Sequence, residues 1–187
     1  MSVYEWILAG CWTAFIVVWF VSWVGAKRTD RRAWRRSFGI RLIFVVVLIV
    51  VLHFTASRTT LEWFVLLRPG PLVAAIGDAL CVGGVAVAIW ARLYLGRNWG
   101  QPMTLQEGHE LVTDGPYRYV RHPIYAGVLA ATLGTALAVP SWSVIFVFMS
   151  IFFAYSMRQE ERMMSEQFPS DYPAYAARTK RLVPFIW

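Results

Sequence analysis

Long runs of apolar residues divide this chain, and they constrain its fold more than any other feature. Five runs can be read as membrane spans, at about residues 6–26, 42–57, 72–95, 124–139 and 142–155. About 18 or more consecutive apolar residues indicate a transmembrane helix. Charged residues make up only 16% of the chain, against about a quarter in soluble domains. The pattern predicts an all-α, polytopic membrane protein with about five transmembrane helices.

The breaks between the runs predict how the helices are connected. Pro140 and Ser141 form a tight break between the last two runs, so we expect a C-terminal helical hairpin. These two runs have about 16 and 14 residues, so the hairpin need not cross the full bilayer. We expect a single membrane domain, residues 1–187, in which residues 1–71 hold two spans with their loops and residues 72–187 form a core.

Small residues in the third run indicate how that helix packs. Gly77, Gly83 and Gly84 all lie within residues 72–95. Small side chains let two membrane helices approach closely. We therefore expect these three glycines to mark a close contact between helices.

The net charge of +7 is concentrated in one loop. Residues 27–41 contain seven basic residues and one acid, with apolar runs on both sides. Such a run can bind nucleic acid, but cytoplasmic loops of membrane proteins are rich in Lys and Arg. The flanking apolar runs favour the cytoplasmic loop.

The position of this loop predicts the topology. With five spans, the N-terminus then lies outside and the C-terminus in the cytoplasm, with membrane lipids and no nucleic acid as partners. The minimal body favours a prokaryotic inner membrane over the endoplasmic reticulum.

One long polar stretch, HELVTDGPYRYVRHPIY at residues 109–125, lies between two apolar runs. A second polar segment follows the last run, and we expect it to be soluble from Arg158 onward. A hairpin brings the start of the fourth span to the end of the fifth. We therefore expect Tyr125 to lie near Glu160 and Glu161, in a site on the cytoplasmic side.

These polar segments resemble the isoprenylcysteine carboxyl methyltransferase family and its phospholipid methyltransferase relatives. The resemblance covers about residues 72–187, and its most specific unit is Arg121-His122-Pro123-x-Tyr125 followed by Glu160-Glu161. The other matching positions are His109, Leu111, Val112, Gly115, Tyr117, Phe168, Tyr172, Tyr175 and Pro184, with Asn98 and Trp99 upstream. The resemblance implies a methyltransferase core that takes S-adenosylmethionine as cofactor in a cytoplasmic pocket. The lipophilic or prenylated acceptor would enter sideways from the bilayer.

The resemblance also implies which residues contact the methyl donor: His109, Glu110, Leu111, Val112, Tyr117, Arg121, His122, Pro123, Ile124 and Glu160. Their chemistry suits that donor. A carboxylate at Glu160 or Glu161 can bind its amino group, and Arg121 with His122 can bind its carboxylate. We expect Arg121, His122 and Glu160 to take part in catalysis. Methyl transfer is an in-line displacement, so orientation in a dry pocket supplies most of the rate enhancement.

One position departs from the family pattern. In the carboxyl methyltransferases an arginine four residues before the donor-binding glutamate holds the substrate carboxylate, and here Ser156 stands there. Arg158 is near, but two residues lie about 200° apart around a helix. Ser156, Arg158 and Trp99 are the candidates for contacts with the acceptor. Carboxyl methylation like that of isoprenylcysteine is the implied reaction. The alternative is methylation of a phospholipid or of an isoprenoid nitrogen or oxygen, with His122 or a glutamate as base.

Two other classes of protein are alternatives. Sterol reductases carry a similar RHPNYxG stretch followed by an acid, but here Ile124 stands at the Asn position and Val128 follows Gly127. A non-enzymatic membrane factor would keep the fold without the chemistry.

No metal is expected, because His109 and His122 lack a paired ligand spacing. The oligomeric state is left open.

Overall fold

The structure, a computed structural model, describes residues 2–23, 38–40, 42–50, 69–99 and 110–183. Its helices are α1 (Val3–Trp23), α4 (Pro71–Leu95), α5 (Pro123–Ala138), α6 (Ser143–Gln167) and α7 (Asp171–Arg178), with short 3-10 turns η1 (Gly96–Asn98), η2 (Gly115–Arg118) and η3 (Pro140–Trp142). A further apolar helix spans Phe38–Val50. Among the described residues, the only extended pairing is an isolated bridge between Val120 and Lys180. The expected all-α fold is confirmed.

Three helices in the described part of the chain are long and apolar enough to cross a membrane. They are α1, α4 and the segment Pro140–Gln167 that contains α6. The helix at Phe38–Val50 and α5 are shorter, and the 16 residues of α5 reach about 24 Å. The rest of the expected second span lies outside the described residues. The count of five spans therefore stays a prediction.

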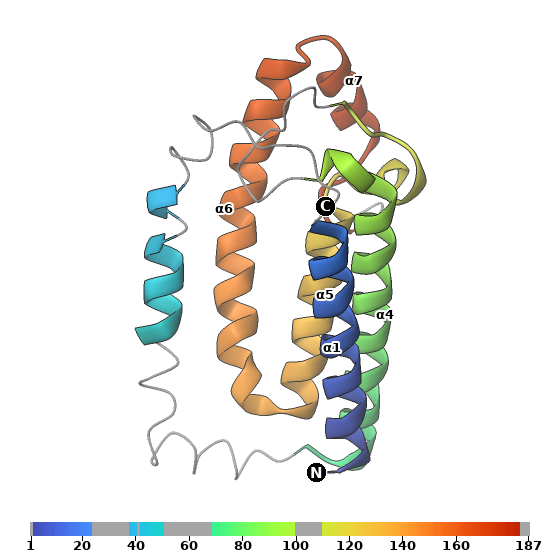
Figure 1. Cartoon of the computed structure of the whole chain (residues 1–187), viewed down its shortest axis with the longest axis vertical. Helices are drawn as coiled ribbons and strands as arrows, with labels where there is room; N and C mark the ends of the chain where they lie inside the picture. Colours follow the sequence, from blue (N-terminus) through green and yellow to red (C-terminus); the bar gives the residue numbers. More distant parts are fainter. Residues whose placement is uncertain (1, 24–37, 41, 51–68, 100–109, 184–187) are drawn as a thin grey trace.

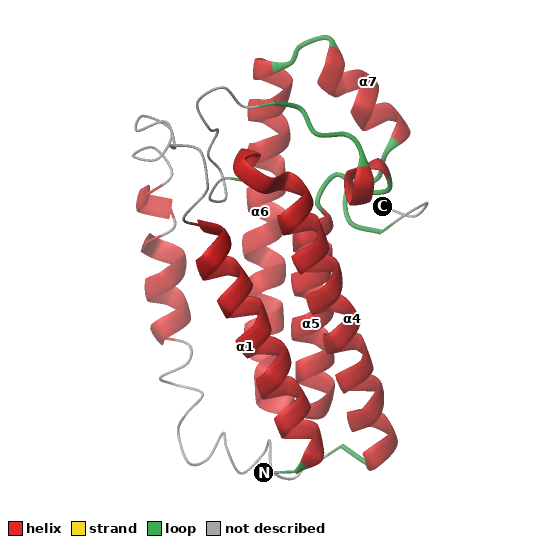
Figure 2. Cartoon of the chain, turned by 45° about the vertical axis from the view of Figure 1, so that its right-hand side comes forward, coloured by secondary structure: helices red, strands yellow, loops and turns green. Residues whose placement is uncertain are grey.

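The long helices form one bundle with two distinct ends (Figure 1). Helices α1, α4 and α6 run in one direction and α5 runs back, lying between α4 and α6, with α1 packed along α4 (Figure 2). We call the end where α4 ends, α5 begins and α7 lies the polar end. The opposite end, where η3 joins α5 to α6, is the hairpin end. The arrangement places both polar segments of the sequence at the polar end.

Close packing of α4 on α5 depends on glycines of both helices. A Cβ atom on Gly84 would lie 2.5 Å from the backbone of Ala131 and of Gly127, and one on Gly77 would lie 2.5 Å from the carbonyl oxygen of Gly134. Gly83 has no atom within 4 Å of such a Cβ. The expected contact is therefore confirmed at Gly77 and Gly84 but wrong at Gly83, which is exposed on α4.

The contrast between the two adjacent glycines makes a matched test of this packing. We expect Gly84→Ala to destabilise the protein by roughly 1–3 kcal/mol, because the new methyl group overpacks a backbone contact. Gly83→Ala should be neutral or slightly stabilising, since Ala is about 1 kcal/mol better than Gly in a helix. Thermal unfolding in detergent, followed by circular dichroism, measures both. Equal unfolding midpoints in the two variants would contradict the contact.

Helix α6 extends beyond the apolar run that the sequence shows at about residues 142–155. It continues to Gln167, so the ten residues 158–167, eight of them charged or polar, extend the helix by nearly three turns. Arg162 and Glu166 form an ion pair at 3.0 Å with the (i, i+4) spacing that supports exposed helices. The change in hydropathy marks the end of the apolar span, but it does not mark the end of the helix.

The helix at Phe38–Val50 packs on α6 through Phe44. Its ring lies 5.5 Å from that of Phe148 and 4.8 Å from that of Phe152. In Figure 1 this helix lies on the side of α6 that faces away from α5. One side of α6 is thus covered by an N-terminal helix, and the side toward α1 and α5 faces a cavity.

Candidate functional site

The polar stretch after residue 109 reaches α5 by a tight turn against α4. Gly115 has φ of +58°, and a Cβ there would lie 2.5 Å from the ring of Tyr94. Glycine is therefore required by both the backbone conformation and the space. The following residue Pro116 and Tyr117 are buried in η2, and the hydroxyl of Tyr117 donates to the carbonyl of Ala91 at 3.4 Å. The turn anchors the stretch on α4.

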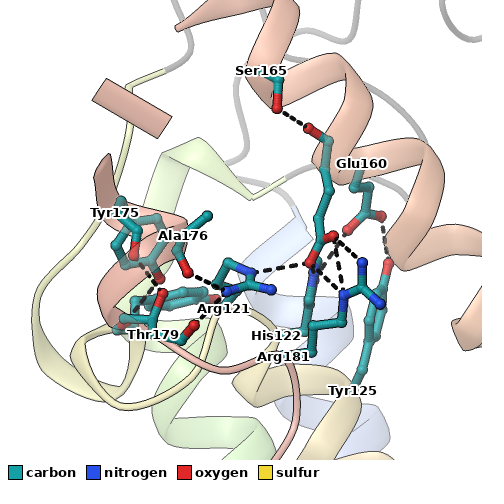
Figure 3. A network of polar contacts seen from close by, with 11 residues as sticks. Arg121, His122, Tyr125, Glu160, Ser165, Tyr175, Ala176, Thr179 and Arg181 are labelled. Carbon is teal, nitrogen blue, oxygen red and sulfur yellow. Dashed lines mark hydrogen bonds and ion pairs between the residues drawn. The ribbon is translucent and has the colours of Figure 1, made fainter. Parts of the chain in front are cut away.

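The next residues pair with the C-terminal segment. The backbone N–H of Arg121 donates to the carbonyl of Lys180 at 2.7 Å, and that of His122 to the carbonyl of Arg181 at 3.0 Å. The Arg121 guanidinium also donates through Nη1 to the carbonyl of Ala176 at 2.9 Å and to that of Thr179. These bonds hold α7 and the segment after it across the polar end, as Figure 3 shows for Ala176 and Thr179.

Glu161 is the centre of a cluster of ion pairs. Its carboxylate accepts from Arg121 Nε at 3.0 Å and from Arg181 Nη2 at 2.8 Å, and His122 Nε2 lies 3.3 Å away. Only 15% of the Glu161 side chain is exposed. Two arginines beside a mostly buried carboxylate hold it ionised. Glu161 therefore connects α6 to Arg121-His122-Pro123, which we call the RHP stretch, and through Arg181 to the C-terminal segment that follows α7.

Glu160, the other glutamate of the pair, points to different partners. Its Oε1 accepts from the hydroxyl of Tyr125 at 2.5 Å, and its Oε2 lies 3.6 Å from His122 Nδ1. The ring of Tyr125 stacks on His122 and on Phe153, with ring centres 5.6 Å and 4.3 Å apart. His122 thus lies between the two glutamates, with one ring nitrogen toward each (Figure 3).

A cavity of about 520 Å³ extends from this cluster into the bundle. Most of the predicted site residues line it, namely Trp99, Glu110, Leu111, Val112, Tyr117, Arg121, His122, Pro123, Ile124 and Glu160. Glu161 is not among the lining residues. The structure therefore separates the twin glutamates, because Glu160 faces the cavity while Glu161 faces the ion pairs.

Three predicted site residues are not placed at the cavity. His109 lies outside the described residues. Ser156 is fully buried in α6 with its hydroxyl unpaired among the described groups, and it does not line the cavity. Because α6 continues past this point, Arg158 projects to the exposed side of the helix. Neither Ser156 nor Arg158 is among the described residues that line the cavity, so a contact of either one with the acceptor stays a prediction.

The cavity also has lining residues that the sequence reasoning missed. Helix α1 contributes Trp12, Phe15 and Trp19, although the resemblance began only at residue 72. Their spacing of three and four residues places them on one helix face, and this signal was present in the sequence. Met163 and Met164 line the polar end from the extension of α6, which hydropathy alone did not predict to be helical.

The tyrosines at the polar end serve as hydrogen-bonding groups. Burial raises the pKa of Tyr175 to about 12, and it raises the pKa of Tyr172 and of Tyr117 above their usual range. All three phenols are therefore neutral near pH 7. The hydroxyl of Tyr175 donates to the carbonyl of Tyr117 at 2.7 Å, which joins α7 to η2. These neutral side chains line the cavity.

Arg92 holds one wall of the cavity at the polar end. It is 1% exposed and donates to the carbonyls of Ser22 at 2.6 Å and Gly96 at 2.9 Å. Its guanidinium carbon lies 4.4 Å from the ring centre of Trp99, a cation–π geometry. Arg92 thus caps the carboxyl ends of α1 and α4 and positions Trp99 against the cavity.

The helices and the cavity define a membrane protein with an internal site that is polar at one end and apolar along the rest. A family model described as phospholipid methyltransferase matches residues 72–171. The chain belongs to this family of membrane methyltransferases, which includes relatives of the isoprenylcysteine methyltransferase type.

Of three relatives, two are named as methyltransferases and one as a metal-resistance protein. The chain is similar to protein-S-isoprenylcysteine O-methyltransferase B of Arabidopsis thaliana, with 29% identity over 76% of this chain and 73% of the relative. It is 32% identical to the A form of that plant, over 61% of this chain and 60% of the relative. It is also 26% identical to the cobalt-zinc-cadmium resistance protein CzcN of Cupriavidus metallidurans, over 85% of this chain and 68% of the relative.

Proposed function

We propose that this protein transfers a methyl group from S-adenosylmethionine to a lipophilic acceptor that reaches the site from the membrane. The single observation that carries the proposal is the course of the cavity. It begins at the cluster of Arg121, His122 and Glu160 and continues among apolar side chains between α1, α5 and α6. A water-soluble donor and a membrane-embedded acceptor can react only in a cavity that has a polar part for the donor and an apolar part for the acceptor. Which end of the bundle faces the cytoplasm stays a prediction of the charge pattern.

The residues at the polar end fit the donor chemically. Glu160 and Glu110 offer carboxylates for an amino group, and His122 offers a ring nitrogen. Leu111, Val112, Tyr117, Tyr172, Met163 and Met164 form apolar and aromatic walls that suit an adenine ring. When bound, the donor supplies a methyl group on a cationic sulfur. Arg121 was expected to take part in catalysis. Its Nε and Nη1 already donate hydrogen bonds to groups of the protein, so we propose that it holds the site together and does not act on the substrate.

The acceptor can belong to one of two classes. The plant relatives are named for isoprenylcysteine, and a carboxylate acceptor is already ionised and needs no base. The site itself favours a second class, an acceptor that must lose a proton, such as an amine, phenol or thiol. Ser156 stands at the sequence position of the family's substrate arginine, and Arg121 and His122 are the only basic side chains among the described lining residues. Glu160, positioned by Tyr125 and His122, is the base that such an acceptor would need.

The proposal is tested with the purified protein in detergent or lipid nanodiscs. S-adenosylmethionine at about 100 times its dissociation constant should stabilise the fold by about 2.7 kcal/mol, seen as a rise in the unfolding temperature, and NADPH should have no effect. Donor with a labelled methyl group is then offered with isoprenylcysteine analogues, aminophospholipids and isoprenoid phenols. Label in the first acceptor alone supports carboxyl methylation, and label in either of the others supports the second class. Stabilisation by NADPH, with none by the donor, would contradict methyl transfer.

A further inference from the structure

A continuous row of aromatic rings lines the cavity from one end of the bundle to the other. Trp19 meets Trp99 edge to face at 6.2 Å and stacks on Phe15 at 4.3 Å, and Phe15 meets Trp12 edge to face at 5.6 Å. Trp12 then stacks on Trp142 with ring centres 5.4 Å apart and an interplanar angle of 27°. All five residues line the cavity, and we call this row the aromatic wall.

The Trp12–Trp142 pair lies at the hairpin end of the wall. Trp142 belongs to η3, and Trp12 comes from α1. The indole N–H of Trp12 donates to the hydroxyl of Thr135 at 3.1 Å, and Thr135 is 1% exposed within α5. Three separate elements therefore hold the pair in place. Because Trp12 is fixed by this hydrogen bond and by stacking on Trp142, the pair can limit the cavity at the hairpin end.

The length of the cavity follows from the residues of η3 and α6 that line it. Trp142 and Glu160 both line the cavity, and the 18 steps along the chain from one to the other correspond to about 27 Å of helix. The walls between them are apolar, with Val128, Ile145 and Met149 opposite the aromatic wall. The hydroxyl of Thr132 is satisfied by the carbonyl of Val128 at 2.9 Å. No described residue in this part of the cavity carries a charge, so it suits a hydrocarbon chain.

We infer that the hydrocarbon chain of the acceptor lies along the aromatic wall, and that the Trp12–Trp142 pair sets the longest chain the protein accepts. The inference rests on the proposed function, because the reacting group of the acceptor is placed near Glu160 and Tyr125. With its reacting group held there, a chain that extends toward the hairpin end must stop at the pair or displace it.

The first experiment measures the chain-length profile of methyl transfer. S-prenylcysteine analogues with geranyl, farnesyl, geranylgeranyl and longer polyprenyl chains are compared in the wild type, Trp12→Ala and Trp142→Ala. We expect kcat/KM for chains longer than the wild-type optimum to rise about tenfold or more relative to shorter chains in the alanine variants, since hydrophobic pockets discriminate by such factors. Trp142→Phe, which keeps a ring, should keep the wild-type profile. Trp90→Ala is the control, because Trp90 is 49% exposed on α4 and does not line the cavity.

The second experiment detects the chain without any turnover. Farnesylcysteine analogues carry a photoreactive diazirine either at the end of the chain or beside the cysteine. We expect the end probe to label the segment around Trp142 and Ile145, and the other probe to label the segment around Trp99 and Ile124. Labelling of the lipid-facing surface near Trp90 by both probes would overturn the inference, as would an unchanged chain-length profile in both alanine variants.

The two experiments separate failure of the inference from failure of the proposed function. End labelling near Trp142 without methylated product from any acceptor would support the aromatic wall as a chain site and remove the methyl transfer. Methylated product with end labelling elsewhere would support the transfer and overturn the chain-length limit. Unfolding temperatures of the alanine variants show whether each one is folded, and the photolabelling of the wild type does not depend on them.

Discussion

Replacing Glu160 by glutamine is expected to weaken donor binding by roughly tenfold to a hundredfold, because hydrogen bonds to charged groups contribute about 1.5–3 kcal/mol. Glutamine keeps the size of the side chain and removes the negative charge. That charge faces the cavity between the hydroxyl of Tyr125 and His122 Nδ1, where we place the amino group of the donor. Equilibrium binding of labelled S-adenosylmethionine to the detergent-solubilised protein measures the loss.

A matched control is available on the same helix. Glu166 pairs with Arg162, and both side chains are largely exposed, at 66% and 75%. Glu166→Gln changes the same chemical group and should leave donor binding within experimental error of the wild type, because it lies away from the cavity. Wild-type affinity in the Glu160→Gln variant would show that the donor does not use this carboxylate. The assignment of the polar end as the donor site would then be lost.

The same variant distinguishes the two acceptor classes. If Glu160 takes a proton from the acceptor, saturating donor does not restore turnover, and kcat stays low in Glu160→Gln. If the acceptor is a carboxylate, no proton is transferred, and saturating donor restores most of kcat. The division of the loss between kcat and donor affinity therefore reports the chemistry of the acceptor.

The sequence predicted the parts of the site whose positions follow from connectivity. The short break at Pro140 predicted that the start of α5 and the end of α6 lie close together, and the hydrogen bond between Tyr125 and Glu160 places them in contact. Pro123 occupies the first turn of α5, a position that proline favours. The contact itself needed only the order of the elements and the break at Pro140.

The rotation of α6 does not follow from the chemistry and spacing of its residues, and only the family resemblance singled out Glu160. Glu160 and Glu161 are about 100° apart around a helix, so only one of them can face a given cavity. Which one does depends on how α6 packs on α5, through contacts such as Phe153 with Tyr125. The same rotation decides that Arg158 is exposed. A sequence pattern gives the relative angles of these residues, but their absolute direction comes from packing between helices far apart in the chain.

The role of α1 was missed for a different reason. Family motifs lie where the chemistry takes place, whereas α1 contributes an apolar wall that many sequences could form. Trp12, Phe15 and Trp19 lie before residue 72, where the resemblance begins, so the family pattern assigned them no role. Their contacts with Trp99 and Trp142 depend on η1 and η3, which bring residues 99 and 142 beside α1.

Replacing Glu161 by glutamine is expected to release the C-terminal segment from the bundle. Removing one partner of a buried ion pair costs about 3–5 kcal/mol. The Arg121 pair is mostly buried, with side chains 12% and 15% exposed, while Arg181 is 34% exposed, so solvent screening reduces its share. The loss should therefore fall mainly on the contact of Arg121 with α6. Arg121 also bonds the C-terminal segment, through its guanidinium to Ala176 and Thr179 and through its backbone N–H to Lys180. Movement of Arg121 away from α6 therefore loosens these bonds.

Amide hydrogen exchange measures this release directly. The N–H groups of Arg121 and His122 donate to the carbonyls of Lys180 and Arg181, so opening of the segment exposes these two amides to solvent. We expect them to exchange at least about tenfold faster in Glu161→Gln, with the amides of the central turns of α5 unchanged. Arg162→Gln, which breaks the exposed ion pair on the same helix, should leave both groups of amides as in the wild type.

The comparison with Glu160→Gln separates the two glutamates by function. If Glu161 acts only by holding the segment, donor binding in Glu161→Gln falls together with the loss of amide protection, whereas Glu160→Gln loses donor binding with protection intact. Unchanged exchange at Arg121 and His122 in Glu161→Gln would contradict the clamp. The polar end would then have to be held closed by the backbone pairing of Val120 with Lys180 and by the hydrogen bond of Tyr175, which do not involve a charge.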